Sequence, residues 1–401
     1  MHGKLRRLAY LLQAPLAPRD LDRLGVNAAR ARGIDVVVFD LCDIVMPNIG
    51  HRRDLHGPVA DIDLRICRTW DEWRGQESLL RQCDLILCLL VDQNLSRAHI
   101  PVMRLVSQTG TPYLVWNGPL VPGWTKNRFI ERLPRRPWQA LEALLSKDYL
   151  DSLIHRLPPS LLGIRPADYI VRSDPGVRRR NRFVGPRTRI IDGHAPDYDV
   201  FRAARERAGP VKNQAIFIDQ FIPHHPDFGF SGTRSLDADV YYATLDRLFS
   251  AVERRLGMSV AIAAHPRADY RDAGSPFGGR PVFRDETARL VLESRLVIMH
   301  ASTAVNFAVL GRKPVMLAAT RPYWEVGVER HLMKEISDRL GTPILFVDQP
   351  DALEFGDVTT VDNARYAAYE AHFIKSPATP DQPLWDIVLD RIQNRDTATA
   401  F

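Results

Sequence analysis

The sequence predicts an α/β protein with two Rossmann-like domains that face each other across a cleft. Short, continuous apolar segments alternate with helical segments in both halves of the chain, a pattern typical of parallel strands covered on both faces. Gly209-Pro210 separates the two series and indicates a hinge. The length of 401 residues exceeds one ordinary core and suits two domains.

The first series covers residues 1–208, the expected N-terminal domain. Apolar runs indicate strands, and apolar stripes with a period near 3.6 residues indicate helices. The strands are expected at 4–12, 34–41, 83–91, 111–118 and 167–174, and the helices at 18–33, 96–110 and 138–157.

The second series covers residues 209–380, the expected C-terminal domain, and residues 381–401 form a terminal helix and tail. The strands are expected at 213–220, 258–266, 295–300, 314–319 and 343–348, and the helices at 237–257, 285–294 and 383–395. A short helix after His300 ends at Gly311, because Pro314 prevents its continuation.

Composition limits the classes of function. Hydrophobic and charged contents of 45% and 25% are those of a soluble globular protein, and no apolar run is long enough to span a bilayer. The net charge of +6 favours acidic partners, and arginines gather in 127–138 and 177–189. No nucleic-acid-binding motif accompanies them. We therefore expect a cytoplasmic protein that binds no nucleic acid and can contact the anionic inner face of the membrane.

The motifs of several enzyme classes are absent from the sequence. There is no GxGxxG after a strand, no GxxxxGK[ST], no GxSxG and no HExxH. The closely spaced His224, His225 and Asp227 fit no standard metal site. We expect neither a cofactor nor a metal.

Polar residues directly follow three expected strands of the second series. Asp219, His265 and His300 each stand at such a strand end, where parallel sheets bind ligands. Two of them have a structural alternative: a helix cap or a plain surface position for Asp219, and a backbone carbonyl partner for His265. As functional groups, Asp219 would be a catalytic carboxylate, and His265 would donate a hydrogen bond to a phosphate or serve as a general acid.

Ser302 and Thr303 stand where the helix after His300 begins. A hydroxyl there can cap the helix by accepting from a free backbone N–H. Both hydroxyls can also join the free N–H groups in holding a phosphate, and the sequence leaves these alternatives even. Arg267, after His265-Pro266, would add a forked guanidinium to such an anion site. In the first domain, His194 follows Gly193 near the expected hinge and would face a substrate lying between the domains.

These motifs resemble those of GT-B glycosyltransferases that use CMP-activated ulosonic acids. "HP" at 265–266 and "ST" within "MHAST" at 302–303 are similar to the His-Pro and Ser-Ser/Ser-Thr motifs of bacterial sialyltransferase-like families, and Kdo-transferase-like proteins are also similar. "IIDGHAPDYD" (190–199) is similar to a stretch in surface-carbohydrate biosynthesis proteins. The motif-bearing resemblance covers about 190–320 of the chain.

The resemblance implies a metal-independent glycosyltransferase that moves a sialic acid-like or Kdo-like sugar from CMP onto a bacterial surface glycan or glycolipid. It implies an acceptor-binding first domain and a donor-binding second domain. The implied donor-binding residues are His265, Pro266, Arg267, His300, Ser302, Thr303 and Asn306, and the catalytic candidates are Asp219, His265 and His194. The family's acidic motif for the base has no match, since the nearest string is Asp71-Glu72-Trp73-Arg74-Gly75.

Two alternatives stay open on the sequence. One is a GT-B transferase that uses a UDP- or GDP-sugar or a polyol-phosphate donor. Such families usually carry an acidic residue for the ribose on the helix face that Asn306 occupies here. The other alternative is a non-catalytic two-domain scaffold, because the base is unassigned. The sugar, the acceptor, the stereochemistry and the oligomeric state are not specified by the sequence.

Overall fold

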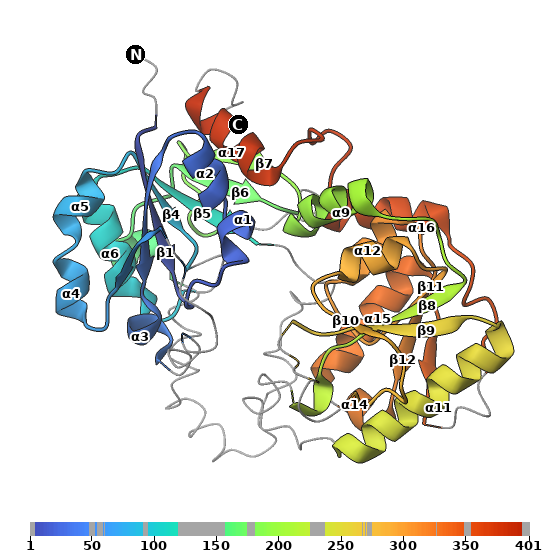
Figure 1. Cartoon of the computed structure of the whole chain (residues 1–401). Coiled ribbons are helices and arrows are strands. Elements are labelled where there is room, and N and C mark those ends of the chain that lie inside the picture. The colour runs from blue at the N-terminus through green and yellow to red at the C-terminus, as the bar shows by residue number, and fades with distance from the viewer. Residues whose placement is uncertain are drawn as a thin grey trace. The chain divides into compact units, whose positions relative to one another are not determined.

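The computed structural model contains two α/β units, each built on a fully parallel sheet (Figure 1). It describes residues 5–47, 53, 59, 61–90, 95–118, 157–174, 181–224, 237–266, 268, 270, 275–325, 327–348 and 354–394. The first unit includes residues up to 119, 127–196 and 377–401, and the second includes 197–376. The prediction of two parallel-sheet α/β domains is confirmed.

The sheet of the first unit has seven strands in the order β3-β2-β1-β4-β5-β6-β7. The strands are β1 Arg7–Leu12, β2 Asp35–Asp40, β3 Asp63–Ile66, β4 Leu85–Cys88, β5 Tyr113–Asn117, β6 Tyr169–Arg172 and β7 Arg189–Asp192. The helices are α1 Asp20–Arg23, α2 Val26–Ala31, α3 Cys42–Val45, α4 Trp70–Arg74, α5 Glu77–Arg81, α6 His99–Thr109, η2 Pro159–Leu162 and α17 Leu384–Gln393. The helix expected at 138–157 lies almost wholly outside the described residues.

Successive side chains of the central strand β1 enter two different cores. Ala9 and Leu11 pack in one with Trp73 of α4, whereas Leu8 and Tyr10 pack in the other with Trp385 of α17. Because both faces of the strand are buried, its sequence shows no polar alternation. This is why a continuous apolar run was the correct signal for β1.

The terminal helix α17 packs on α2 and belongs to the first unit (Figure 1). The indole Nε1 of Trp385 donates to the Arg23 carbonyl at 2.8 Å, and Arg32 forms ion pairs with Asp386 and Asp390. Gly25 has a φ of +77°, and a Cβ added there would lie 2.3 Å from the Trp385 ring. The last helix is therefore fixed by close approach to a glycine before α2.

The sheet of the second unit has six strands in the order β10-β9-β8-β11-β12-β13. The strands are β8 Gln214–Ile218, β9 Ser259–Ala263, β10 Val282–Phe283, β11 Leu296–Met299, β12 Val315–Ala319 and β13 Ile344–Phe346. The helical elements are α9 Pro196–Arg207, η3 Ile222–His224, α11 Ala238–Leu256, α12 Thr287–Leu292, α13 Val305–Leu310, α14 Arg321–Glu325, α15 Gly327–Leu340, α16 Asn363–Tyr369 and η5 Glu370–Ile374. In the described part of the chain, no helix is long and apolar enough to cross a membrane.

A buried carboxylate ties the segment that enters β8 to the end of α12. Glu293 accepts from the Gly209 N–H at 3.0 Å, from Lys212 Nζ at 2.8 Å and from Arg289 Nη1 at 2.8 Å. Burial by itself would raise the pKa of Glu293, but these three donors outweigh it and lower the pKa to about 2. The ionised carboxylate therefore stabilises the fold.

We expect Gly25→Ala to destabilise the protein by more than about 2 kcal/mol, because it adds steric overlap with Trp385 to the cost of a left-handed φ. Gly33→Ala is the matched control, since Gly33 has a φ of +69° but nothing within 4 Å of the added Cβ. Thermal unfolding of both variants measures the difference. Equal losses of stability would contradict the packing of Trp385 on Gly25.

We expect Glu293→Gln to cost about 3 kcal/mol near pH 7, because Lys212 and Arg289 lose a buried partner. The folded pKa lies below the unfolded value, so this contribution is complete above about pH 4.5 and is lost as the pH falls towards 2. Glu286→Gln, which removes an exposed partner of the same Arg289, is the control. Urea unfolding at pH 7 and pH 3 should show the variant's deficit shrinking with acid.

Candidate functional site

The second sheet has a topological switch point between its two central strands. β8 is followed in sequence by β9 on one side of it, whereas β11 is followed by β12 on the other side. The crossovers therefore diverge, and the loops that leave β8 and β11 lie side by side at the carboxyl edge of the sheet, where such sheets bind ligands. Asp219-Gln220 and His300 to Thr303 lie in these two loops. The structure thus brings the predicted strand-end residues of the second unit together.

Asp219 is buried and accepts hydrogen bonds from its own loop and from the segment that follows β9. Its Oδ1 accepts from the Phe221 N–H at 2.8 Å, and its Oδ2 accepts from the His265 N–H at 3.3 Å and the Tyr270 hydroxyl at 2.6 Å. Burial raises the pKa of Asp219 above its ordinary value, although each of these donors acts to lower it. The carboxylate therefore holds the loop after β8 and the segment after β9 in place.

Gln220 links the two sides of the switch point. Its Nε2 donates to the carbonyl of Ala301, in the loop that leads from β11 to Ser302. The next residue, Phe221, adopts a left-handed φ of +53°, which is uncommon for a bulky side chain. The loop after β8 is therefore held in one particular path against the loop after β11.

The loop after β9 carries His265 and Pro266. His265 is half-buried and its carbonyl accepts from the Ala268 N–H at 2.9 Å, which closes a tight turn, and Pro266 is exposed. The predicted guanidinium of Arg267 lies outside the described residues. His265 thus stands at the carboxyl edge, as the sequence predicts.

His300 lies in the core. The imidazole is fully buried, its Nδ1 donates to the Ala318 carbonyl, and its Nε2 accepts from the Tyr241 hydroxyl at 2.8 Å. Burial is the largest influence on this ring and lowers the pKa of His300 to about 4, despite the Ala318 carbonyl, which acts to raise it. A direct contact between His300 and a donor stays a prediction, and the geometry favours a supporting position.

Ser302 and Thr303 lie in the loop between β11 and α13. The Ser302 Oγ accepts from the Ala304 N–H at 3.2 Å, but Ala304 is the N-cap residue of α13, and no side chain caps that helix. Thr303 is exposed and its carbonyl accepts from the Asn306 N–H at 3.0 Å. The Ser302 hydroxyl thus makes a local contact, and the neighbouring Thr303 is exposed.

Asn306 is directed towards α9. Its Nδ2 donates to Asp197 Oδ2 at 2.7 Å, and the residue is buried. A carboxylate partner that the sequence could not foresee therefore holds the amide. Its part in donor binding stays a prediction.

His194 lies in the first unit, after β7. The ring is fully buried, and its Nδ1 and Nε2 lie 3.0 and 2.8 Å from the carbonyls of Ala195 and Gln382. These contacts fix the segment before α17, and the catalytic role of His194 stays a prediction. The acidic string at Asp71-Glu72 lies on α4, where Glu72 accepts from the Arg68 N–H and its own N–H donates to the Thr69 cap.

Sequence reasoning missed Tyr270 and Tyr241 as parts of this region, whereas Gln220 stands with Asp219 among the expected strand-end residues. Tyr270 and Tyr241 reach the site only through the tertiary structure, since one follows the β9 turn and the other lies on α11. Gln220 stands beside Asp219 in sequence, so its position at a strand end was the signal available. Hydroxyl partners of buried polar groups had no such signal.

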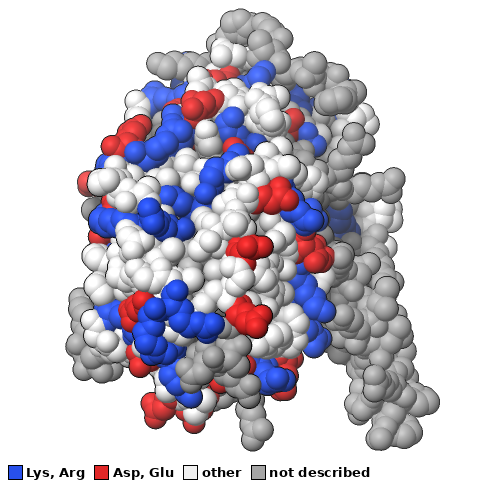
Figure 2. Space-filling view, turned by 90° about the vertical axis from the view of Figure 1, so that its right-hand side faces the viewer, with Lys and Arg blue, Asp and Glu red and all other residues white. Residues whose placement is uncertain are grey.

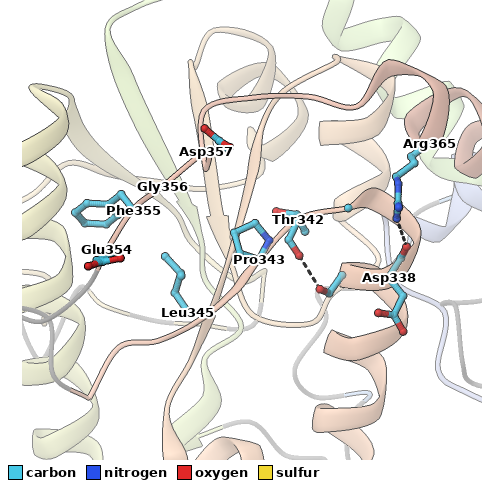
Figure 3. Close-up of a pocket in the computed structure, with 11 residues that line it drawn as sticks. Asp338, Thr342, Pro343, Leu345, Glu354, Phe355, Gly356, Asp357 and Arg365 are labelled. Atoms are coloured by element: carbon cyan, nitrogen blue, oxygen red, sulfur yellow. Dashed lines mark hydrogen bonds between the residues drawn. The ribbon is translucent and has the colours of Figure 1, made fainter.

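A separate cavity of about 750 Å³ lies near the amino end of β13 (Figure 3). Asp338, Glu354 and Asp357 line it, together with Phe355 and Arg365, which donates to the Asp338 carbonyl at 2.6 Å. Three carboxylates against one arginine disfavour an anionic nucleotide. The cavity also lies at the amino ends of the strands, whereas the switch-point loops lie at the carboxyl ends, so it is a poor candidate for the donor site.

Charges of both signs are interspersed on the face shown in Figure 2. That face presents no continuous basic surface. The arginine-rich segment 127–138 lies outside the described residues, as do 175–180, whereas 181–189 are described. Among the described residues there is no group of three or more side chains suited to hold a metal ion.

Comparison with known proteins gives fold similarity alone. No family model and no curated protein matches the chain. The wall teichoic acid polymerase TagF, as an H444N variant, is similar with 11% identity, 98% of this chain and 90% of that chain covered, and a TM-score of 0.52. The same variant soaked with CDPG has 10% identity, 98% and 89% coverage, and a TM-score of 0.53.

A glycotransferase of kitacinnamycin has 13% identity, covers 96% of this chain and 98% of that one, and has a TM-score of 0.49. The TagF structures, which have the GT-B fold, resemble this chain in fold at low sequence identity. The chain therefore has the GT-B class of fold, two α/β units with seven- and six-stranded parallel sheets.

We expect the His300 imidazole to stay neutral, protonated on Nδ1, from pH 8 to about pH 5. Since its folded pKa lies below the unfolded value near 6.5, the stability it contributes falls as the pH drops from about 6.5 towards 4. Nitrogen-15 shifts of the ring report this directly. A ring that becomes charged between pH 7 and 6 would contradict the buried position.

Proposed function

We propose that the protein is a glycosyltransferase that transfers a sugar from a nucleotide donor bound at the β8/β11 switch point. The observation that carries the proposal is the set of groups at this carboxyl edge: Asp219-Gln220, His265 and Ser302-Thr303 follow three adjacent strands. The GT-B fold is consistent with this activity, since the solved structures that resemble the chain include glycosyltransferases.

The chemistry of these groups suits a phosphate leaving group. Breaking a glycosidic bond to a nucleotide increases the negative charge on the phosphate, and positioned donors lower the barrier. Thr303 is exposed beside Ser302 in the loop after β11, and His265 lies in the loop after β9. These donors would act without a metal, which is part of the proposal.

A CMP-linked ulosonic acid is the donor that we propose. Support comes from the sequence, where His265-Pro266 and Ser302-Thr303 match the His-Pro and Ser-Thr motifs of sialyltransferase-like proteins. Such a donor carries a phosphate and a sugar carboxylate, and the net charge of +6 suits two anionic groups. The acceptor in this proposal is a surface glycan or glycolipid bound by the first unit.

The proposed location is the cytoplasm, with contact at the inner face of the membrane through the arginines of 127–138 and 177–189. Clustered arginines bind anionic headgroups or an anionic glycan by the same electrostatic attraction. The mixed charges in Figure 2 disfavour the face shown there as the contact surface.

A polyol-phosphate donor is the second candidate. The fold similarity to the wall teichoic acid polymerase TagF, one structure of which was soaked with CDPG, favours it over a UDP- or GDP-sugar. The same cluster of hydroxyls and His265 would bind its phosphates. The nucleotide that stabilises the protein separates the two candidates.

We expect CMP to raise the melting temperature, and UDP and GDP to have little effect. A rise in melting temperature with CDP but not with CMP would favour the polyol-phosphate candidate. A rise with UDP alone would rule out the ulosonate donor. No response to any of the four would favour a non-catalytic scaffold. Bound ligand stabilises by mass action, so about 100 times the Kd should add about 2.7 kcal/mol.

In the same assay, Ser302→Ala with Thr303→Ala should remove the CMP response while the protein remains folded. Thr69→Ala is the control, because the Thr69 hydroxyl caps α4 in the first unit by accepting from the Glu72 N–H at 3.2 Å. Like Ser302→Ala, it removes a hydroxyl that accepts a backbone N–H, at a cost of about 1 kcal/mol, without touching the site. An undiminished CMP response in the double variant would exclude both hydroxyls from the site.

A further inference from the structure

We propose that Asp219 is a positioning residue that fixes the donor-site loops, and that it is not the base of the reaction. The inference rests on the proposed function and reassigns the residue that the sequence favoured as a catalytic carboxylate. It is based on the three hydrogen bonds that the carboxylate accepts and on where their donors lie.

The oxygens of Asp219 are occupied on the protein side. A carboxylate offers about four acceptor positions, and Phe221, His265 and Tyr270 take three of them at 2.6 to 3.3 Å. The residue is only 2% exposed. A base must meet the hydroxyl whose proton it takes, and this carboxylate presents almost no surface to an acceptor.

The three donors belong to the segments that follow β8 and β9. Phe221 is in the loop after β8, and His265 is in the loop after β9, within the His-Pro pair. The Tyr270 ring also packs against Phe221, with ring centroids 5.8 Å apart, and against Phe277 at 5.3 Å. One buried carboxylate therefore sets the paths of both loops and of the aromatic side chain between them.

The same anchor extends to the loop that carries the hydroxyls. Gln220 follows Asp219, and its side chain donates to the Ala301 carbonyl, next to Ser302. The left-handed φ of Phe221 is a strained state for which the Asp219 Oδ1 contact compensates. Loss of Asp219 should therefore displace His265 and Ser302 together, although neither side chain touches it in the described contacts.

The test measures CMP binding by calorimetry in wild type, Asp219→Asn and Tyr270→Phe. Asn presents an NH₂ group to one set of donors, so we expect affinity to fall at least about tenfold. Tyr270→Phe removes one donor and should weaken CMP about threefold to tenfold without unfolding the protein. If Asp219 were the base, its replacement would leave CMP binding unchanged. A CMP affinity equal to wild type in Asp219→Asn would therefore overturn the proposal.

Hydrogen exchange without ligand gives a second readout. The amides of Phe221 and His265 should exchange faster in Asp219→Asn, and that of His265 also in Tyr270→Phe. Asp362→Asn is the control, because Asp362 accepts from the N–H groups of Ala364 and Arg365 at 3.0 Å elsewhere in the unit. This variant should change neither the exchange of the Phe221 and His265 amides nor the affinity for CMP.

The two readouts separate this inference from the proposed function. If wild type does not bind CMP, the CMP donor is wrong, and amide exchange alone then decides whether Asp219 holds the loops. If Asp219→Asn does not fold, Tyr270→Phe provides both measurements. Unchanged exchange of Phe221 and His265 in a folded variant would overturn the positioning role.

Discussion

Parallel strand pairing is the constraint on which the rest of this structure depends. Every strand of a parallel sheet ends at the same edge, so residues that directly follow different strands must become neighbours. In the second unit the crossovers diverge at β8 and β11, which leaves the loops after these strands without a helix between them. Asp219, Gln220 and Ser302 are close because the topology requires it.

Burying polar groups at that edge creates the order that a binding site needs. Asp219 is stable there only because three donors surround it, and His300 only because Tyr241 and Ala318 satisfy its ring. Each buried group fixes the backbone that supplies its partners. The exposed groups, such as the Thr303 hydroxyl, then project from loops whose paths are already set.

The sequence could predict the strands with two buried faces and the identity of their terminal residues. It could not predict β3, because Asp63–Ile66 is a mostly exposed edge strand without an apolar run, nor β10, which has two residues. His300 and Asp219 look like site residues from their strand-end positions, yet both side chains are buried. The hydroxyls of Tyr241 and Tyr270, which satisfy them there, come from residues distant along the chain.

A crystal structure with CMP bound tests the central claim most directly, since that claim places the phosphate at the β8/β11 switch point. The account predicts phosphate oxygens within about 3 Å of Ser302, Thr303 and the His265 loop, with Asp219 still bonded to Phe221 and Tyr270. A phosphate bound elsewhere, for example in the acidic cavity beside Asp338 and Glu354, would contradict it. So would Asp219 turned outward to face the ligand.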